Sequence, residues 1–344
     1  MEHPSLAASP DRLIEKPRRP QTGRTADDVL SDVLRTIRLS GSLQFCFMPK
    51  GEWQTEGKRG LASLADDPSV AIPFHILVEG ACWLRMEDRE TMLEAGDVVA
   101  FPFASPHKLG VGAHGSPIAP IDDLPPKPWR EVPILRYGDR GAGVRLLCGY
   151  LHCDAMRFRP LRNALPALMH VRTARSDDAG WLRATIGQME AEVARGRPGA
   201  LSMLERLTEI VFIELLRHQM LAAGPAATGW LAALAEPALG RCLALIHDDP
   251  ARDWSVQELA AASALSRSAL TERFETVLDT SPIRYLRDWR LCLASVALTT
   301  TSKTVADIAY DAGYGTEAAF SRAFSRTYGT PPAAWRQAAR RGAS

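Results

Sequence analysis

The chain has 344 residues, of which 46% are hydrophobic, and a formal net charge of +1 at pH 7. This length predicts two domains with sizeable cores, and the near-zero charge excludes a protein whose entire surface attracts a polyanion. Six scattered cysteines include no Cys-x-x-Cys pair, no signal peptide precedes them, and no apolar run is long enough to span a membrane. These features predict a cytoplasmic protein without a disulfide framework.

Residues 1–25 contain four prolines and the pair Arg18-Arg19 but no apolar periodicity, so they predict a disordered tail. From residue 26 to about residue 160, short apolar runs are separated by glycine and proline. The runs that predict strands are Leu43–Met48, Ile72–Val78, Cys82–Met86, Asp97–Phe101 and Val144–Tyr150. Their spacing favours a sandwich or barrel, with residues 111–133 as a long excursion at one end.

After residue 160 the pattern becomes helical, and residues 161–236 form a predicted helical linker. Apolar residues recur at helical spacing over 177–195 and 198–221. The second of these helices is too apolar on one side to stand alone in water. It therefore either packs on the barrel or forms the seam of a homodimer. Residues 224–229 predict a short hinge.

Two helical units of the same kind follow, at residues 255–274 and 304–324. Each begins with a capping box, in which a hydroxyl and a carboxylate exchange hydrogen bonds with backbone donors. Each then passes through a tight turn into a second helix that has Ser or Thr at its cap. The cap residues are Ser255 with Glu258, Thr304 with Asp307, and then Ser266 and Thr316.

The second helix of each unit has an inward apolar face and an outward polar one. Leu270 and Phe274 are four residues apart and would face inward, as would Phe320 and Phe324. Short polar and basic side chains on the outward face suit the reading of base edges in a DNA groove. The predicted DNA-contacting residues are Arg267, Ser268, Thr271 and Glu272, and then Thr316, Glu317, Ala318, Ser321, Arg322 and Arg326.

A third helix, predicted from Ile283 to Leu298, separates the two units and is preceded by a Ser281 cap and Pro282. Its length of roughly 25 Å can set two reading helices near the ~34 Å repeat of successive major grooves on one face of DNA. From Phe320 to Ser344 there are five arginines and no acid, which suits contact with phosphates. Together these features predict binding to double-stranded DNA.

Residues 237–338 resemble the DNA-binding domain of the AraC/XylS family of transcription regulators, with residues 339–344 as a tail. The resemblance rests on Val305-Ala-Asp-Ile-Ala-Tyr-Asp-Ala-Gly-Tyr314, Phe320-Ser-Arg-Ala-Phe-Ser-Arg-Thr-Tyr-Gly329 and Pro331-Pro-Ala-Ala-Trp-Arg336. It implies base contacts from Ser268, Thr271 and Glu272, and from Glu317, Ala318, Ser321 and Arg322.

Two features of these units need separate interpretation. Ala264 stands in the first turn where the family usually has glycine, which leaves the shape of that turn open. Glu272 and Glu317 are unusual on a surface that approaches phosphates. They either accept hydrogen bonds from cytosine amino groups or orient neighbouring arginines, and we favour the second interpretation.

Residues 26–160 resemble the cupin-type sensory domain that often precedes this DNA-binding unit, and cupins are β jelly rolls. Residues 73–80 and 96–107 look like degenerate forms of the two cupin motifs. Metal-binding cupins usually offer two histidines and a glutamate from the first motif and a histidine from the second. Of that set, His75, Glu79 and His107 are present here.

Further polar residues lie on or just after a later strand and could approach the same cavity: Cys148, His152 and Cys153. Two histidines with a thiolate or a carboxylate would suit zinc. Because half of the usual ligand set is missing, we favour histidines that line an apolar effector pocket or satisfy hydrogen bonds of the barrel. An oxidant-sensing cysteine is a further option, weighed against simple buried thiols such as Cys242 and Cys292.

The sequence thus predicts an α+β protein with an N-terminal cupin-like β jelly roll, a helical linker region and a C-terminal all-α domain with two helix-turn-helix units. The predicted function is that of a sequence-specific transcription regulator, an activator and not an enzyme. Its expected partners are promoter DNA, RNA polymerase, a second copy of the chain, and a small molecule, metal or oxidant sensed in the barrel. The alternatives are a cupin-fold metal-dependent enzyme with a helical assembly domain and a ligand-sensing module that acts through a protein partner.

Overall fold

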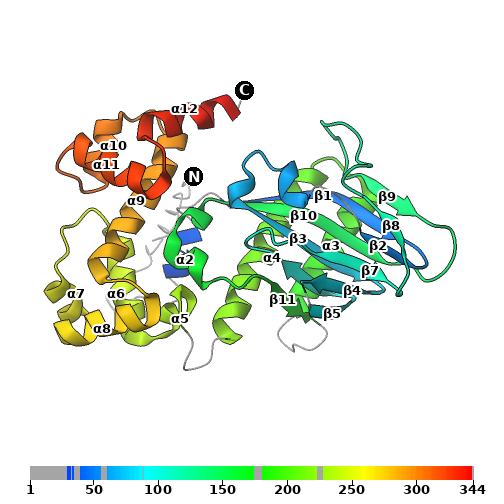
Figure 1. Ribbon diagram of the computed structural model, residues 1–344, viewed down its shortest axis with the longest axis horizontal. Coiled ribbons are helices and arrows are strands. Elements are labelled where there is room, and N and C mark those ends of the chain that lie inside the picture. The colour runs from blue at the N-terminus through cyan, green and yellow to red at the C-terminus, as the bar shows by residue number, and fades with distance from the viewer. Residues whose placement is uncertain are drawn as a thin grey trace, which may run out of the picture.

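The computed structural model describes residues 29–31, 33–34, 39–55, 60–87, 89–173, 180–222 and 228–342. The predicted disordered tail at residues 1–25 lies outside the described residues, as does most of the predicted hinge. A strand-rich body and a helical body lie side by side (Figure 1), which confirms the predicted α+β fold.

The strand-rich body consists of two sheets. The first sheet contains β1 (Leu39–Pro49), β3 (Ala71–Glu79), β6 (Asp97–Ala100), β9 (Ile134–Tyr137), β10 (Arg145–Cys153) and β11 (Met169–Arg172), in the spatial order β11-β6-β3-β10-β1-β9. The second contains β2 (Trp53–Thr55), β4 (Ala81–Met86), β5 (Arg89–Glu94), β7 (Lys108–Val111) and β8 (Ser116–Ile118), in the order β5-β4-β7-β2-β8. Most neighbours are antiparallel, whereas β1 with β9 and β2 with β8 are parallel.

Side chains of the first sheet alternate between two cores, because successive residues of a strand point to opposite faces. In β10, Leu146 and Cys148 belong to the core between the two sheets, whereas Leu147 and Leu151 belong to the outer face. Two helices pack on that outer face, α3 (Gly180–Arg195) and α4 (Ala200–Ala222). The inner face of the first sheet therefore lines the interior of the barrel, and its outer face is covered by helices.

Helix α4 crosses β1 at very short range. A Cβ atom added at Gly41 would lie 2.5 Å from Cβ of Thr208 and 2.6 Å from the carbonyl oxygen of Glu205, closer than real Cβ atoms approach. The apolar face of α4 is thus packed on the barrel, one of the two arrangements that the sequence leaves open. Ile210 and Leu221 remain exposed on the same helix, so the homodimer remains a prediction.

Among the described strands, β2, β5, β7, β8, β9 and β11 lie outside the predicted runs. Two of them lie where other structure was predicted. β11 lies within the predicted helical linker, yet it pairs with β6 at the edge of the first sheet. β8 lies within the predicted excursion at 111–133 and pairs with β2. Both are only three or four residues long, too short for a period-2 pattern to stand out, and each is held by a strand distant in sequence. The first sheet consequently extends beyond residue 160.

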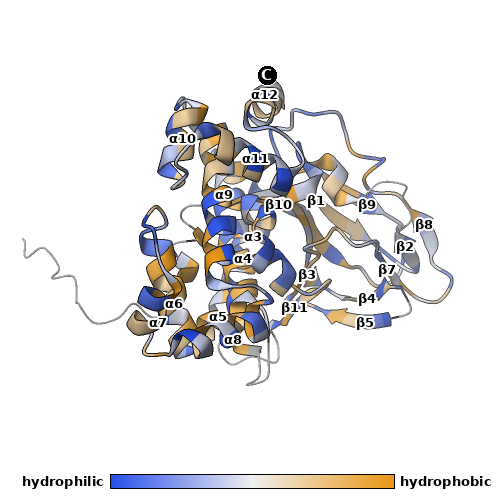
Figure 2. Ribbon diagram, turned by 60° about the vertical axis from the view of Figure 1, so that its left-hand side comes forward, coloured by the Kyte–Doolittle hydropathy of each residue, from blue (hydrophilic) through white to orange (hydrophobic). Residues whose placement is uncertain are grey.

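The helical body contains α5 (Trp230–Ala235), α6 (Pro237–Asp248), α7 (Val256–Ala262), α8 (Arg267–Leu278), α9 (Pro282–Thr300), α10 (Val305–Asp311), α11 (Glu317–Tyr328) and α12 (Pro332–Gly342). Both predicted capping boxes form, at the starts of α7 and α10. The predicted caps also form, since the hydroxyls of Ser266, Ser281 and Thr316 accept backbone N–H groups of α8, α9 and α11. Along these helices hydrophobic and hydrophilic residues alternate, as in amphipathic helices (Figure 2).

One large core joins the two bodies. It runs from the outer face of the first sheet through α3 and α4 into α5 to α9, and it includes Ile76 of β3, Phe212 of α4 and Trp289 of α9. The last three helices have a separate core with the end of α9, formed by Leu291, Ala294, Leu298, Ile308, Ala309, Ala312, Phe320 and Phe324. The first helix-turn-helix unit is therefore fused to the barrel's core, whereas the second has its own. Within the described ranges, no helix is long and apolar enough to cross a membrane.

Candidate DNA-reading surface and barrel cavity

Helices α7 and α8 form the first helix-turn-helix unit. The turn between them passes through Ala264, whose φ of +58° lies in the left-handed region. The inner side of α8 buries Leu270 and Phe274, as predicted. On the outer side Arg267, Ser268 and Glu272 are exposed, and Thr271 is half-buried with its hydroxyl donating to the carbonyl oxygen of Arg267 at 3.0 Å.

The Ala264→Gly variant is expected to raise the free energy of unfolding by about 1 kcal/mol. A Cβ in the left-handed conformation costs roughly 1–2 kcal/mol, and the extra freedom of glycine in the unfolded chain offsets part of the gain. Urea denaturation measures the change. Ala261→Gly, at an exposed position of α7, should lower the same free energy by about 0.5–1 kcal/mol. Equal destabilisation by both substitutions would show that Ala264 is not strained.

Helices α10 and α11 form the second unit, with Gly313 in the turn at a φ of +73°. Phe320 and Phe324 are buried on the inner side of α11. Most of the predicted contact residues lie in solvent: Thr316, Glu317, Ala318, Arg322 and Arg326 are exposed, and Ser321 is half-buried. The two units thus have similar outer faces, and the outer face of the second unit is the more basic.

The acidic residues of these faces do not orient arginines in the structure. Within the described part of the chain, neither Glu272 nor Glu317 forms an ion pair. The neighbouring Arg273 instead pairs with Glu236, with 3.3 Å between Nε and Oε1. The favoured interpretation of the two glutamates as arginine-orienting groups is therefore not supported by the geometry.

The arginine-rich end of the chain is partly used in folding. The Nε atom of Arg336 donates to the carbonyl oxygen of Leu298 at 3.1 Å, and its Nη2 donates to that of Lys303 at 2.6 Å. This guanidinium joins the end of α9 to the segment before α10, so two of its five N–H donors are used within the fold. The side chains of Arg340 and Arg341 lie outside the described residues.

A cavity of about 740 Å³ opens into the barrel. Its walls are largely apolar and include Phe45, Phe47 and Leu109, and its polar base holds His75, His107 and Cys148. The Nδ1 atom of His75 lies 3.1 Å from Sγ of Cys148, and its Nε2 lies 2.9 Å from Nε2 of His107. The ring of His107 stacks on Phe101 with centroids 3.7 Å apart.

The last hydrogen bond of this chain determines which atom is the donor in each of the others. His107 Nδ1 lies 2.9 Å from the carbonyl oxygen of Ser105, which can only accept, so Nδ1 carries the hydrogen. Burial lowers the pKa of both His75 and His107, and the neighbouring His107 further lowers that of His75, so both rings are neutral. His107 Nε2 therefore accepts from His75 Nε2, and His75 Nδ1 accepts from the Cys148 thiol.

These residues do not fit the metal site that the cupin resemblance implies. Cys148 contacts one ring nitrogen of His75 and His107 contacts the other, on opposite edges of the ring, so one ion cannot bind all three side chains. Glu79 pairs with Arg145 at 3.0 Å, and His152 bonds to Asp154 at 3.3 Å, so neither joins the histidine pair. Among the described residues, no three His, Cys, Asp or Glu side chains are arranged to hold a metal.

All six cysteines are buried, as expected for simple core thiols. Burial raises the pKa of Cys148 well above its ordinary value, and the nearby Cys46 and Cys82 add to the shift. Burial likewise raises the pKa of Cys242 and Cys292 to about 12. Reactive thiols have depressed pKa values, so this geometry gives no support to the oxidant-sensing option.

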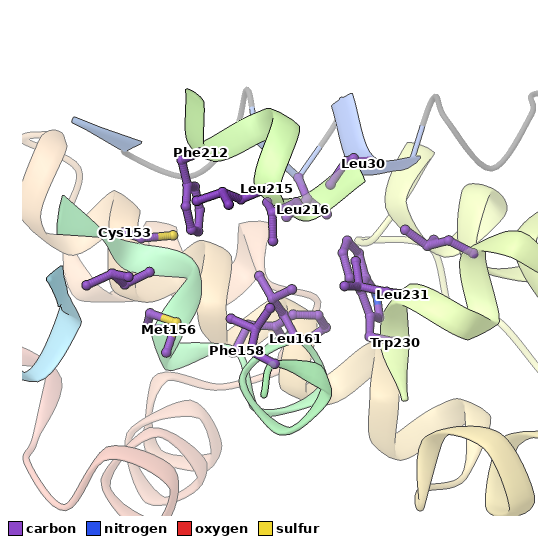
Figure 3. Close-up of a cluster of buried hydrophobic side chains, with 14 of the residues drawn as sticks. Leu30, Cys153, Met156, Phe158, Leu161, Phe212, Leu215, Leu216, Trp230 and Leu231 are labelled. Atoms are coloured by element: carbon purple, nitrogen blue, oxygen red, sulfur yellow. The ribbon is translucent and has the colours of Figure 1, made fainter. Parts of the chain in front are cut away.

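The segment that follows β10 joins the barrel to the first helix-turn-helix unit. It comprises η3 (Asp154–Arg157) and α2 (Arg159–Ala164), and its Phe158 is only 1% exposed. The Phe158 ring lies 5.2 Å from Trp289, 5.4 Å from Tyr285 and 6.4 Å from Trp230, between centroids. In Figure 3, Phe158 and Leu161 of this segment point toward Leu215 and Leu216 of α4 on one side and Trp230 on another.

The same segment also contacts α12, which packs against the core of the second unit. Cζ of Arg157 lies 5.0 Å from the ring centroid of Trp335 in α12, and the guanidinium also pairs with Asp154 and Asp67. The sequence analysis singled out neither Phe158 nor Arg157. A phenylalanine and an arginine after a strand look like an ordinary core residue and an ordinary surface residue, and only the fold shows what they meet.

Comparison with known proteins gives two family matches. A family model described as a cupin matches residues 28–221, and one described as a helix-turn-helix domain matches residues 259–338. The chain is 31% identical over 313 residues to a putative AraC-like transcription regulator of Streptomyces lividans, which covers 90% of this chain and 98% of the relative. It is 30% identical over 313 residues to the HTH-type transcriptional regulator AlkR of Acinetobacter baylyi, covering 90% of this chain and 99% of that one.

Proposed function

The chain belongs to the AraC-like family of transcription regulators and carries that family's DNA-binding domain, and on this premise we propose that one chain reads promoter DNA with both of its helix-turn-helix units. The DNA-binding domain would begin near residue 237, after a sensory domain and linker. Helices α8 and α11 are the proposed recognition helices, each in a major groove on the same face of the duplex. The proposed contacts come from Arg267, Ser268, Thr271, Glu272, Thr316, Glu317, Ala318, Ser321, Arg322 and Arg326.

The observation that carries this proposal is the repetition of one design about a shared helix. Each recognition helix buries two apolar residues four apart and exposes short polar side chains on its outer side. Both units pack on α9, whose 19 residues span about 28 Å. That length is comparable with the ~34 Å between successive major grooves on one face of DNA. A single rigid chain can therefore reach two grooves.

Arg322→Ala is expected to lower affinity for the preferred duplex by about 10- to 100-fold, because one good base contact is worth roughly 1–3 kcal/mol. Arg322 is exposed near the middle of α11, where a side chain reaches base edges. Titration of a fluorescent duplex, selected by the wild-type chain from a random pool, measures the loss. Discrimination should relax at one base position of the site.

Arg326→Ala is the matched control, since Arg326 is exposed one turn later on the same helix. If Arg326 meets a phosphate, its loss weakens binding to all sequences alike and makes the dependence on log salt shallower by about one. Arg140, which is exposed between β9 and β10, serves as a second control that should change nothing. A wild-type chain indifferent to sequence would overturn the proposal.

We place the signal in the barrel cavity. The chain from Cys148 through His75 and His107 to Ser105 uses every ring nitrogen. A ligand that leaves this chain intact would therefore contact the apolar walls and the other polar lining residues, among them Thr55, Arg85 and Lys108. The strand that carries Cys148 continues directly into the segment of Phe158 and Arg157. A shift of β10 would thus reach both reading units within a few residues, which is the proposed route from signal to DNA.

The remaining partners follow from this role. As an activator the regulator would contact RNA polymerase beside its site on the promoter. Exposed apolar residues of α3 and α4, such as Trp181, Met203 and Ile210, offer a seam for a homodimer. The relatives are transcription regulators, and we propose that the barrel senses rather than catalyses, because His75, His107 and Cys148 are engaged with one another.

A further inference from the structure

The two reading units have little apolar packing in common. The first shares the large core that includes Tyr285 and Trp289 of α9, and the second packs on Leu291 and Leu298 of the same helix. Packing within each core fixes each unit internally. The angle between the units therefore depends on α9 and on polar contacts that pass from one unit to the other.

Arg290 of α9 makes such contacts to the first unit. Its Nε donates to the carbonyl oxygen of Pro250 at 2.6 Å, and its Nη2 donates to those of Ala251 at 3.2 Å and Arg252 at 2.8 Å. These three residues lie between α6 and α7. A single guanidinium thus closes a run of backbone acceptors that no helix satisfies.

This loop is in turn joined to the start of α7. The guanidinium of Arg252 stacks on Trp254, with Cζ 3.9 Å from the ring centroid, and its Nη2 lies 3.0 Å from Oε1 of Glu258. Glu258 is the carboxylate of the α7 capping box. A movement of the Arg290 side chain would therefore be passed to the first helix of the first unit.

The other side of the same guanidinium meets the turn of the second unit. A Cβ added at Gly313 would lie 2.8 Å from Cζ of Arg290 and 3.0 Å from each Nη atom. The backbone of the turn thus rests on the guanidinium plane, and the glycine permits this close approach. Gly313 leads into α11 through Thr316, the cap of that helix.

We propose that Arg290 is a positioning residue that sets the angle and spacing between the two recognition helices, and hence the spacing of the two half-sites that the regulator accepts. It touches no base in this role. It acts by holding the loop at 250–252 against the turn at Gly313 across α9. The proposal rests on the proposed reading of DNA by both units.

The test compares the affinities of each chain for several related duplexes, not its affinity for a single one. The selected duplex is used intact, with one base pair inserted between its half-sites, and with one or the other half-site scrambled. An inserted base pair moves one half-site by ~3.4 Å and rotates it by about 34°. For the wild-type full chain this should cost about tenfold or more in affinity, because the second contact is then no longer gained as an intramolecular one.

Arg290→Met is expected to weaken binding to the intact duplex by about tenfold and to reduce the cost of the inserted base pair to less than about threefold. Binding to the duplex that keeps only the second unit's half-site should change by less than about twofold. Arg284→Met is the matched control, because it removes an exposed arginine of α9 and should keep the full cost of the insertion.

Gly313→Ala approaches the same contact from the other side and keeps the test decisive if Arg290→Met folds poorly. Its effect has two parts: strain at positive φ, which persists in any background, and displacement of the guanidinium, which disappears when Arg290 is absent. In the double variant of Gly313→Ala and Arg290→Met, the cost of the inserted base pair should therefore equal that in Arg290→Met alone.

The outcomes separate the two proposals. A wild-type chain that binds the intact and inserted duplexes equally would overturn both. A wild-type chain that discriminates, together with an Arg290→Met variant that keeps the full insertion cost, would overturn the positioning role alone. Equal losses by Arg290→Met on the intact duplex and on the single half-site would also overturn it, since they would show only a general loss of the folded domain.

Discussion

Replacing Phe158 by alanine is expected to lower the free energy of unfolding by about 3–5 kcal/mol, the usual cost of removing a buried phenylalanine ring. The ring is 1% exposed and lies among Trp230, Tyr285 and Trp289. Urea denaturation followed by circular dichroism measures the change. Because the ring joins the barrel to the first helix-turn-helix unit, the variant should also unfold in two separable steps.

Phe103→Ala is the matched control. Phe103 is another phenylalanine of the same chain, 41% exposed, and its loss should cost less than about 1 kcal/mol. A Phe158→Ala variant that is no less stable than this control would mean that the two bodies are not joined through this ring. A single cooperative transition of the variant would show that other contacts, such as those of α4 with α5, suffice to hold them together.

Lowering the pH from 7 to 5 is expected to remove about 2 kcal/mol of stability through His247 alone. Burial lowers the pKa of His247 to about 3, whereas the histidine of an unfolded chain titrates near 6.5. Between these values the unfolded state binds a proton that the folded state does not. Stability therefore falls by about 1.4 kcal/mol for each pH unit below 6.5, and His75 and His107, whose pKa values are also lowered, act in the same direction.

The contribution of His247 is isolated by the His247→Leu variant. Nε2 of His247 lies 2.7 Å from the hydroxyl of Tyr285, so the substitution costs some stability at every pH. Its curve of stability against pH from 7.5 to 5 should nevertheless be shallower than the wild-type curve, by about 1.4 kcal/mol per unit in the acidic part. Carboxylates titrate mostly below this range. Parallel curves would show that His247 has the same pKa in the folded and unfolded states.

Local patterns predicted the helical half of the molecule well. The capping boxes at Ser255 and Thr304, the caps at Ser266 and Thr316, and the buried pairs at Leu270 and Phe320 all involve residues three or four apart, so one turn of sequence contains the whole interaction. The three longest strands, β1, β3 and β10, were predicted for a similar reason, since their apolar runs are visible without knowing the partner strand.

What the sequence could not predict depends on distant partners. The strand at Met169–Arg172 forms because β6 offers an open edge. His75 and His107 were placed in one cavity by motif, but only the fold shows that Cys148 contacts the nitrogen of His75 opposite to His107. Arg290 lies within the helix predicted from Ile283 to Leu298, and its three carbonyl acceptors become visible only when the loop at 250–252 is in place.

The division of the hydrophobic cores along α9 has a consequence for how such regulators diverge. The first reading unit shares its interior with the barrel, so the two must be inherited together or be repacked at many positions. The second unit, from about Leu291 onward, has its own interior and meets the rest of the chain through few side chains, among them Trp335 against Arg157 and Gly313 against Arg290. Recombination between relatives could exchange this terminal piece, and with it half of the recognised DNA sequence, while the sensor and its signal stay unchanged.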